Sequence, residues 1–263
     1  MHHAEVTERR QAPRRRATLS RVTRLALALL LLVPAISWAR APVDEALALY
    51  ASYHLDLGNL DRARDLLEAD LRKAPTLPAL LALARVYFTV GDVEARTDEE
   101  KLVAYARGRD VAKRAIELAP RNPDAHFLYG ATIARWGQTK GIFRSLFLLP
   151  TVKQELQTIF EIDPNHAAGH ALAGNVYLEL PAIAGGSVAT AEEHFRKALA
   201  TAPRYTAIRI GLARTLIRRG QYAAARAQID AVLAERDPAF VADWTVKDLP
   251  RAKKLLAEIQ DKR

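Results

Sequence analysis

Two histidines and two glutamates are the side chains whose spacing could support chemistry. His166 and His170 lie four positions apart, which on a helix would place both imidazoles on one face, as a metal site requires. His166, however, comes just after the turn at Pro164, and no carboxylate follows at a metal-ligand spacing, so packed or solvated histidines are expected instead. Glu192 and Glu193 are adjacent, and adjacent helical side chains point apart, which argues against joint acid–base catalysis.

The chain also lacks the motifs and residue types of common active sites. It contains no glycine-rich nucleotide loop, no Gly-x-Ser-x-Gly and no HExxH. It has no cysteine, which excludes disulfides, thiolate zinc sites, cysteine nucleophiles and lipid attachment at an N-terminal cysteine. The sequence therefore predicts a protein that is not an enzyme, has no cofactor and no metal site, and acts by binding.

Composition and charge indicate a helical body behind a basic N-terminus. Of the 263 residues, 50% are hydrophobic and 26% are charged, which is typical of a globular chain. Leu, Ala, Arg and Glu dominate and strand-type runs are nearly absent, so the expected fold class is all-α. The formal net charge is +9, but residues 1–39 hold seven arginines and only two glutamates. The excess of positive charge therefore belongs largely to the N-terminus, and no nucleic-acid partner is expected.

Residues 1–39 have the order of parts of a secretory signal peptide. Arginines precede an uninterrupted apolar run from Leu25 to Ile36, and a small residue, Ala39, ends the segment. Twelve apolar residues are too few to span ~30 Å of hydrocarbon. We expect cleavage after Ala39 or Ala41, with an uncleaved inner-membrane anchor as the alternative. Either outcome predicts an exported, periplasmic body.

Regularly placed prolines indicate that the body is built from repeats. Each proline follows an Ala-rich, apolar helix end, and a turn residue comes 16 or 17 positions after each of the first four. This constant distance predicts that the first helix of every unit has the same length. The prolines are Pro75, Pro120, Pro164, Pro203 and Pro238.

The repeat unit resembles the tetratricopeptide repeat. The fourth copy matches best, with a small residue and an aromatic on its first helix and Ala, Phe, Ala and Pro on its second: Gly174, Tyr177, Ala191, Phe195, Ala198 and Pro203. The resemblance implies a right-handed α-solenoid of about five helix pairs over residues 43–263, closed by a C-terminal capping helix. We expect that capping helix to begin with Asp248 as its N-cap.

Three units exceed the length of the repeat, and the surplus falls between their two helices. The insertions lie near residues 92–107, 138–150 and 181–187, so we expect them along one edge of the solenoid. Thr97 and Glu100 form a capping-box sequence that predicts where the second helix of unit two starts, and Ser187 is the expected N-cap in unit four. The apolar third-unit insertion is either a packed helix extension or a lip over a cavity or subunit interface. Its candidate residues are Ile142, Phe143, Phe147 and Leu148.

The insertions together resemble those of the T component of TRAP transporters and of the related regulators of microtubule dynamics. The resemblance rests on the long second-unit helix that ends AKRAIELAP, on the apolar third-unit insertion, and on the stretch LPAIAGGSVATAEEHFRKALATAP at residues 180–203. It implies an exported repeat protein that offers a largely hydrophobic cavity and partners a periplasmic solute receptor.

The first helices of a tetratricopeptide array line its concave groove, which gives a candidate binding surface. Its arginines could hold a carboxylate with two parallel hydrogen bonds, or they could simply keep an exposed face soluble. Counted from each proline, the groove residues are Arg85, Phe88, Phe127, Arg135, Asn175, Leu178, Ile210, Arg214 and Ile217.

The sequence therefore favours an accessory ligand- or partner-binding subunit of a periplasmic, TRAP-type solute-uptake system. The expected partner is a periplasmic solute-binding protein or another envelope protein, and self-association, a small organic acid and an apolar ligand stay open. The alternative is a generic periplasmic tetratricopeptide adaptor for envelope-assembly proteins.

Overall fold

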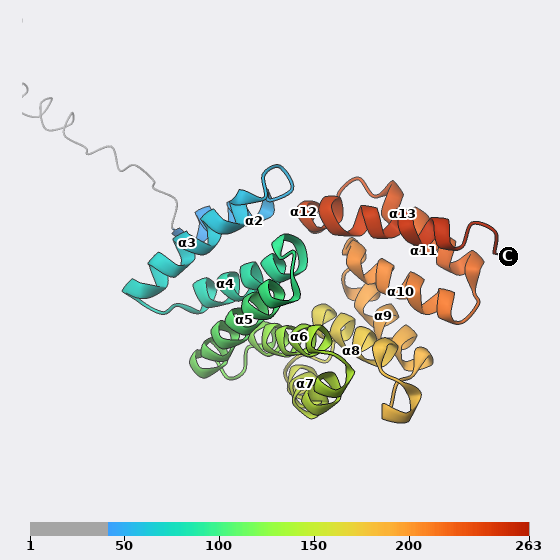
Figure 1. Cartoon of the computed structure of the whole chain (residues 1–263), viewed down its shortest axis with the longest axis horizontal. Helices are drawn as coiled ribbons and strands as arrows, with labels where there is room; N and C mark the ends of the chain where they lie inside the picture. Colours follow the sequence, from blue (N-terminus) through green and yellow to red (C-terminus); the bar gives the residue numbers. More distant parts are fainter. Residues whose placement is uncertain (1–41, 263) are drawn as a thin grey trace, which may run out of the picture. The chain divides into compact units, whose positions relative to one another are not determined.

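The computed structural model describes residues 42–262, and within that range the chain is a solenoid of five consecutive helix pairs (Figure 1). We number these pairs as units one to five. They are α2 (Pro42–Ala51) with α3 (Gly58–Lys73), α4 (Leu77–Thr89) with α5 (Asp98–Leu118), α6 (Pro123–Lys140) with α7 (Ile142–Ile162), α8 (Ala167–Glu179) with α9 (Val188–Thr201), and α10 (Thr206–Arg218) with α11 (Tyr222–Ala234). The predicted all-α solenoid of about five pairs is confirmed.

The leader predicted over residues 1–39 lies outside the described residues. Among residues 42–262, no helix combines the length and the apolar character that a membrane crossing requires.

A repeated hydrogen bond fixes how one unit follows another. At the three junctions that follow Pro120, Pro164 and Pro203, the residue six positions after the proline lies on the first helix of the next unit, and its side chain donates to that proline's carbonyl. The bonds run from His126 Nε2 to Pro120 at 2.9 Å, from His170 Nε2 to Pro164 at 3.0 Å, and from an Arg209 guanidinium nitrogen to Pro203 at 3.1 Å. Each bond satisfies a carbonyl in the turn and sets the angle at which the next helix starts.

Close packing between units four and five depends on two glycines around one phenylalanine. Phe195 of α9 is fully buried. A Cβ added at Gly174 of α8 would lie 2.9 Å from its ring, and one added at Gly211 of α10 would lie 2.3 Å away. Both distances are too short for real carbon atoms, so only glycine lets α8 and α10 approach the ring this closely. The predicted role of Phe195 as core filler is confirmed.

The insertions take three different forms. In unit two, a π-helical turn, η1 (Val90–Glu94), extends α4, and α5 begins with the predicted capping box between Thr97 and Glu100. In unit three, α7 starts at Ile142, directly after Gly141, so the insertion is an extension of the second helix. In unit four, the 3₁₀ turn η2 (Ala182–Ala184) precedes α9, and the Ser187 hydroxyl caps α9 as expected, accepting from the Thr190 N–H at 3.1 Å.

The C-terminal helix α13 (Leu249–Glu258) begins directly after Asp248 as predicted, but helical structure precedes it and the Asp248 side chain makes no capping bond. Helical structure starts with α12 (Val241–Asp243), passes through a second π-helical turn, η3 (Trp244–Asp248), and continues into α13. Asp248 therefore lies inside a continuous helical run and caps nothing. The predicted position is correct but the predicted cap is wrong, because the buried Asp248 carboxylate accepts a hydrogen bond from Thr206 Oγ1 at 2.7 Å and none from the first turn of α13.

The solenoid curves so far that its C-terminal segment contacts unit one. Figure 1 shows α12 beside the end of α2. Ala242 packs in one buried cluster with Tyr53 and Leu60, and the half-buried Val246 packs against that cluster. The five units and the C-terminal segment thus form a closed ring, whose inner face is the concave side of the solenoid.

Candidate functional site

The concave face of units two and three is covered by the chain's own C-terminal segment. Phe88 of α4 lies with its ring centroid 5.9 Å from the Arg135 guanidinium carbon and 5.9 Å from the Lys247 ammonium. The Arg85 guanidinium carbon lies 6.0 Å from the ring centroid of Phe240. Three predicted groove residues, Arg85, Phe88 and Arg135, therefore lie in this region. Phe240 and Lys247 of the C-terminal segment contact them, so they do not line an open groove.

Asp92 stands at the centre of this contact. It belongs to η1, and its side chain is only 4% exposed. The Tyr105 hydroxyl donates to its Oδ1 at 2.8 Å, Arg135 Nε lies 3.3 Å from Oδ1, and Lys247 Nζ lies 3.2 Å from Oδ2. Burial raises the pKa of Asp92, but the positive charges of Arg135 and Lys247 and the Tyr105 hydrogen bond outweigh it, so the pKa lies below its usual value. Arg135 thus already holds a carboxylate.

A second carboxylate, Asp243, extends the contact to unit one. Its Oδ1 accepts a hydrogen bond from the hydroxyl of Tyr53 and lies 3.7 Å from Lys247 Nζ. Burial and the Asp243 charge raise the pKa of Tyr53, so the phenol stays protonated and donates. We call these residues the closing cluster, because they join units one, two and three to the C-terminal segment: Tyr53, Asp92, Tyr105, Arg135, Asp243 and Lys247.

The other predicted groove residues have separate surroundings. The Phe127 ring meets the His166 ring edge-on at 6.2 Å between centroids, and Asn175 donates to the Ala171 carbonyl of its own helix at 2.9 Å. Leu178 and Ile210 are buried in the core of units four and five. Their expected place on an open groove is wrong, because the first helices bury a wider stripe than the inward positions counted from the prolines. Ile217 is half-buried and packs against the same core.

Arginines gather at the end of α10, on the edge where the two helices of each unit meet. Arg214 and Arg218 both pair with Glu179, and Arg218 also donates to the Leu178 carbonyl. Arg219 pairs with the buried Glu192, which Arg196 also contacts. We call this set the arginine cluster: Arg196, Arg214, Arg218, Arg219, Glu179 and Glu192. It holds more guanidiniums than carboxylates, and its arginines are partly exposed, so it retains positive charge toward solvent.

The residues of the third-unit insertion divide into one packed and three exposed side chains. Leu148 is half-buried and packs against the core of units three and four. Ile142, Phe143 and Phe147 remain exposed at the start of α7. The insertion is therefore a helix extension that packs through one face and presents apolar side chains on the other.

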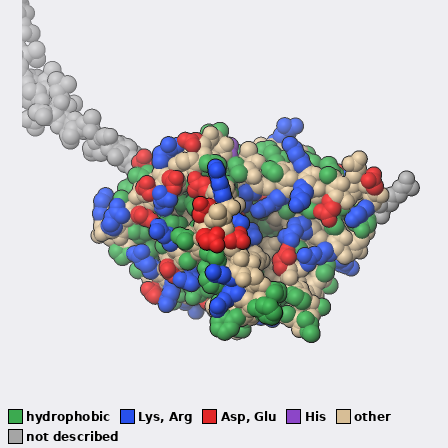
Figure 2. All heavy atoms as spheres, in the orientation of Figure 1, with side chains coloured by type: hydrophobic (Ala, Val, Ile, Leu, Met, Phe, Trp, Pro, Cys, Tyr) green, Lys and Arg blue, Asp and Glu red, His purple; other side chains and the backbone are tan. Residues whose placement is uncertain are grey.

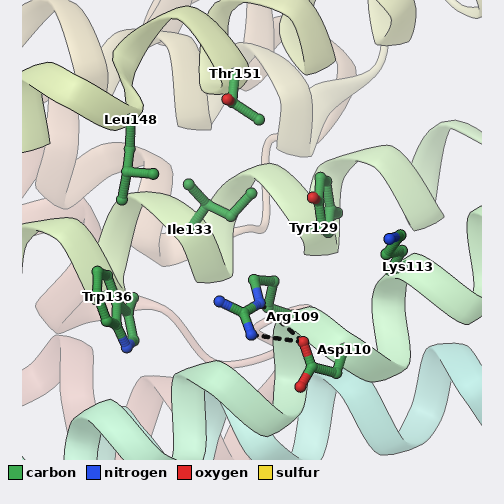
Figure 3. Close-up of a pocket in the computed structure, with 8 residues that line it drawn as sticks. All are labelled: Arg109, Asp110, Lys113, Tyr129, Ile133, Trp136, Leu148 and Thr151. Atoms are coloured by element: carbon green, nitrogen blue, oxygen red, sulfur yellow. Dashed lines mark hydrogen bonds and ion pairs between the residues drawn. The ribbon is translucent and has the colours of Figure 1, made fainter.

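Leu148 also lines an outer hollow of about 330 Å³ between α5, α6 and α7 (Figure 3). Ile133 and Trp136 lie with Leu148 on its apolar side, whereas charged groups of α5 face them across the hollow. Arg109 and Asp110 pair with each other at 2.7 Å. A second hollow of about 400 Å³ between α3, α4 and α5 includes Arg72, Arg107 and Arg114 among its lining residues. The residues that line these two hollows include no constellation of nucleophile and base.

The histidine pair considered from the sequence is engaged in packing. His166 caps α8, accepting from the Gly169 N–H at its Nδ1 at 3.1 Å. His170 Nδ1 lies 2.9 Å from His194 Nδ1, and the His170 ring stacks on Phe160 with 4.5 Å between centroids. Within residues 42–262, no three metal-ligating side chains come together.

Sequence reasoning missed Asp92, Asp243 and Lys247, which lie at the centre of the closing cluster. Asp92 was visible only as part of a Gly91-Asp92 turn, and nothing local distinguishes Asp243 or Lys247 from surface charges. Only the structure marks two of them, because Asp92 lies in the π-helical turn η1 and Lys247 in η3, and π-helical turns occur frequently at functional sites.

Asp248 provides a test of the buried charges beside the closing cluster. Burial raises the pKa of Asp248 from 3.8 to about 6, against the Thr206 hydrogen bond and the positive charge of Arg251, which lower it. Its Oδ1 has no hydrogen-bond partner among the described residues. Because the folded pKa exceeds the unfolded one, the contribution of Asp248 to stability is fully present below pH 3.8 and is lost as the pH rises through about 6.

We therefore expect Asp248→Asn to be more stable than the wild type at pH 7–8, by up to about 3 kcal/mol, and expect this advantage to shrink toward pH 4. The measurement is urea unfolding of both proteins across this pH range. Burial also lowers the pKa of His170 and of His194, so those residues oppose the Asp248 effect near pH 6, but they are common to both proteins and cancel in the difference. A pH-independent difference would contradict the assignment.

Comparison with known proteins places the fold in a family. Residues 43–180 match the family described as regulator of microtubule dynamics protein 1-3, and residues 182–259 match the tetratricopeptide repeat. Regulator of microtubule dynamics protein 1 of Mus musculus is 28% identical over 140 residues, which are 53% of this chain and 45% of that protein. The chain thus matches less than half the length of this curated relative.

A solved structure supports the architecture. A thermophilic tetratricopeptide-repeat protein of Thermus thermophilus superposes with a TM-score of 0.61 at 23% identity, covering 83% of this chain and 97% of that one. At this identity the likeness shows the fold alone. The resemblance to tetratricopeptide repeats and to regulators of microtubule dynamics is confirmed, whereas the resemblance to the TRAP T component stays a prediction. Since the first family match spans just over half of the sequence, the chain belongs to the regulator of microtubule dynamics protein 1-3 family.

Proposed function

We propose that this chain is a non-catalytic, exported repeat protein that binds a protein partner through the arginine cluster, as an accessory subunit of a TRAP-type solute-uptake system. The tetratricopeptide fold supports the general part of the proposal, because such repeats present extended surfaces to other proteins. The observation that carries it is that Arg214 and Arg218 converge on one partly exposed carboxylate, Glu179.

The geometry of this site suits an acidic side chain from a partner. Arg214 donates to one carboxylate oxygen of Glu179 and Arg218 to the other, so the two guanidiniums hold one carboxylate between them and show where such a group fits. A partner's carboxylate could join or displace Glu179 at little cost, because exposed ion pairs contribute only about 0–1 kcal/mol each. Arg135, by contrast, is committed to Asp92 inside the ring. The arginine cluster is therefore a better candidate for partner binding than the concave face.

The proposed location outside the cytoplasm rests on the signal-peptide pattern of residues 1–39. A basic segment, an apolar run and a small-residue end over residues 1–39 favour export, to the periplasm or to an inner-membrane anchor facing it. There the proposed partner is a periplasmic solute-binding protein whose acidic surface faces the arginine cluster.

The test is cross-linking in intact cells, followed by affinity capture and mass spectrometry. We expect a solute-binding protein as the dominant partner, with its recovery reduced at least ~tenfold in the double variant Arg214→Gln, Arg218→Gln. The matched control is Arg121→Gln with Arg236→Gln, which also removes two exposed guanidiniums but leaves the cluster intact. Equal recovery from the two variants would refute binding through the arginine cluster.

An adaptor for envelope-assembly proteins is the second candidate. It is favoured by the closing cluster, because a concave face covered by the chain's own C-terminal segment leaves less room for a small solute and favours a protein partner on the outside. The same capture experiment separates the two. Assembly proteins as the dominant partners would support the adaptor and exclude the uptake role.

A further inference from the structure

Large apolar side chains project from one edge of the ring at two neighbouring places. At the start of α7, Phe143 is 88% exposed and Phe147 is 72% exposed, and Ile142 lies beside them. On the η2 turn, Ile183 is 99% exposed. Figure 2 shows hydrophobic side chains gathered along the lower edge of the molecule, where Figure 1 places α7 and the segment between α8 and α9. We call Ile142, Phe143, Phe147 and Ile183 the apolar edge.

The η2 turn holds Ile183 out rigidly. Gly185 has φ +88°, a conformation that L side chains rarely adopt, and a Cβ on Gly186 would lie 1.9 Å from the Leu180 carbonyl oxygen. The Gly186 N–H donates to the Pro181 carbonyl, and the Ser187 N–H donates to the Tyr177 carbonyl, both at 3.0 Å. This turn keeps Ile183 away from the core. Because its side chain is fully exposed, it contributes no buried apolar area to folding.

Cations flank the apolar edge. The Lys140 ammonium lies 5.8 Å from a Trp136 ring centroid, and the Arg144 guanidinium carbon lies 5.5 Å from that of Phe147. The Lys153 ammonium links the two places, since it lies 3.8 Å from where a Cβ on Gly185 would stand.

In the part of the chain that the structure describes, no carboxylate pairs with these cations, and the nearby Glu179 and Glu192 are held by arginines. Residues 136–154 and 180–191 contain no Asp or Glu. Among the described residues, no carboxylate lies within ion-pair distance of Lys140, Arg144 or Lys153. The edge is thus apolar at its tips with three cations beside them that are in no ion pair within residues 42–262, which complements a surface that is apolar inside and anionic outside.

We propose that the apolar edge inserts into the headgroup region of an anionic phospholipid bilayer, with the three cations bound to lipid phosphates. Aromatic and aliphatic tips beside Lys and Arg are the pattern of proteins that lie on a membrane without crossing it. A second copy of this chain is a poorer occupant, because pairing two such edges would bring six cations together with no acidic side chain between them.

The experiment measures co-sedimentation of residues 40–263 with vesicles of equal parts phosphatidylcholine and phosphatidylglycerol. This fragment is the single compact unit that contains every described helix. We expect the protein to bind, and the triple variant Phe143→Ser, Phe147→Ser, Ile183→Ser to lower the partition coefficient at least ~tenfold. A variant with Lys140, Arg144 and Lys153 replaced by Gln should lose about fivefold per charge, and pure phosphatidylcholine should bind the wild type weakly.

The matched control is Leu55→Ser with Val103→Ser, two exposed apolar residues outside the apolar edge. Circular dichroism and thermal unfolding check that every variant folds. Control binding equal to wild type supports the proposal. Absence of wild-type binding, or equal loss in control and triple variant, overturns it. A wild-type dimer that the triple variant converts to a monomer, with no vesicle binding by either, would overturn it in favour of a subunit interface.

Discussion

Lys247→Met is expected to lower the free energy of unfolding by about 3–5 kcal/mol, since removing one partner from a buried ion pair leaves uncompensated charge. Lys247 Nζ lies 3.2 Å from Asp92 and 3.7 Å from Asp243, and all three side chains are nearly buried. Without the Lys247 ammonium, the buried Asp92 and Asp243 carboxylates lose a positive charge that stabilises both of them, and little water replaces it. Urea unfolding followed by circular dichroism measures the loss.

The same substitution is expected to open the ring. Because the chain has no cysteine, dyes can be attached at two introduced ones, at the exposed positions Leu55 and Arg236, and energy transfer between them should fall in Lys247→Met. Lys254→Met on α13 is the control, with an expected effect within about 0.5 kcal/mol. In a double-mutant cycle, Asp92→Asn should cost less in the Lys247→Met background than alone. Strictly additive effects would contradict the closing cluster.

Phe195→Ala is the second large effect, with an expected loss of about 3–5 kcal/mol in the free energy of unfolding. Phe195 is fully buried between α8 and α10, and its removal leaves a cavity that these helices cannot easily close. Phe147→Ala, which removes an exposed ring, is the control and should change stability by no more than about 0.5 kcal/mol. Thermal or urea unfolding distinguishes the two.

Gly211 sharpens this test. In the wild type, a methyl group at Gly211 would meet the Phe195 ring at 2.3 Å, so Gly211→Ala should be destabilising. In the Phe195→Ala background the same methyl group enters empty space, and Gly211→Ala should become neutral or stabilising. An equal cost of Gly211→Ala in both backgrounds would show that the ring does not set the approach of α10.

Most of the fold could be predicted from the sequence, because the start and the end of each helix are set by residues close to it in the chain. Prolines mark the helix ends, and the capping box at Thr97 and Glu100 marks a start that the structure reproduces. Asp248 shows the limit. An aspartate before Leu-Pro is a good local N-cap signal, and α13 does begin at Leu249. The Asp248 carboxylate nevertheless bonds to Thr206, far away in the chain, and the π-helical turn η3 leads directly into α13.

The candidate site was less predictable, because it depends on curvature summed over all units. Of the predicted groove residues, Phe88 and Arg135 lie against each other, and Arg85 lies against Phe240 of the C-terminal segment. What they meet could not be foreseen, since a small change in the angle between units would separate the C-terminal segment from unit one. Leu178 and Ile210 were misplaced for a local reason, because neighbouring helices cover more of each first helix than a single inward stripe leaves open.

Closure of the ring also changes the order in which the units are expected to unfold. In an open array each repeat touches only its neighbours, so the terminal repeats fray first and stability is a sum of adjacent interfaces. Here Tyr53 and Asp243 tie the first unit to the end of the chain across 190 positions. That contact has high contact order, so it should form late and slowly in folding, after the local helix pairs. Once it is made, unit one and the C-terminal segment hold each other, and amide exchange in α2 and α12 should be as slow as in the middle of the array.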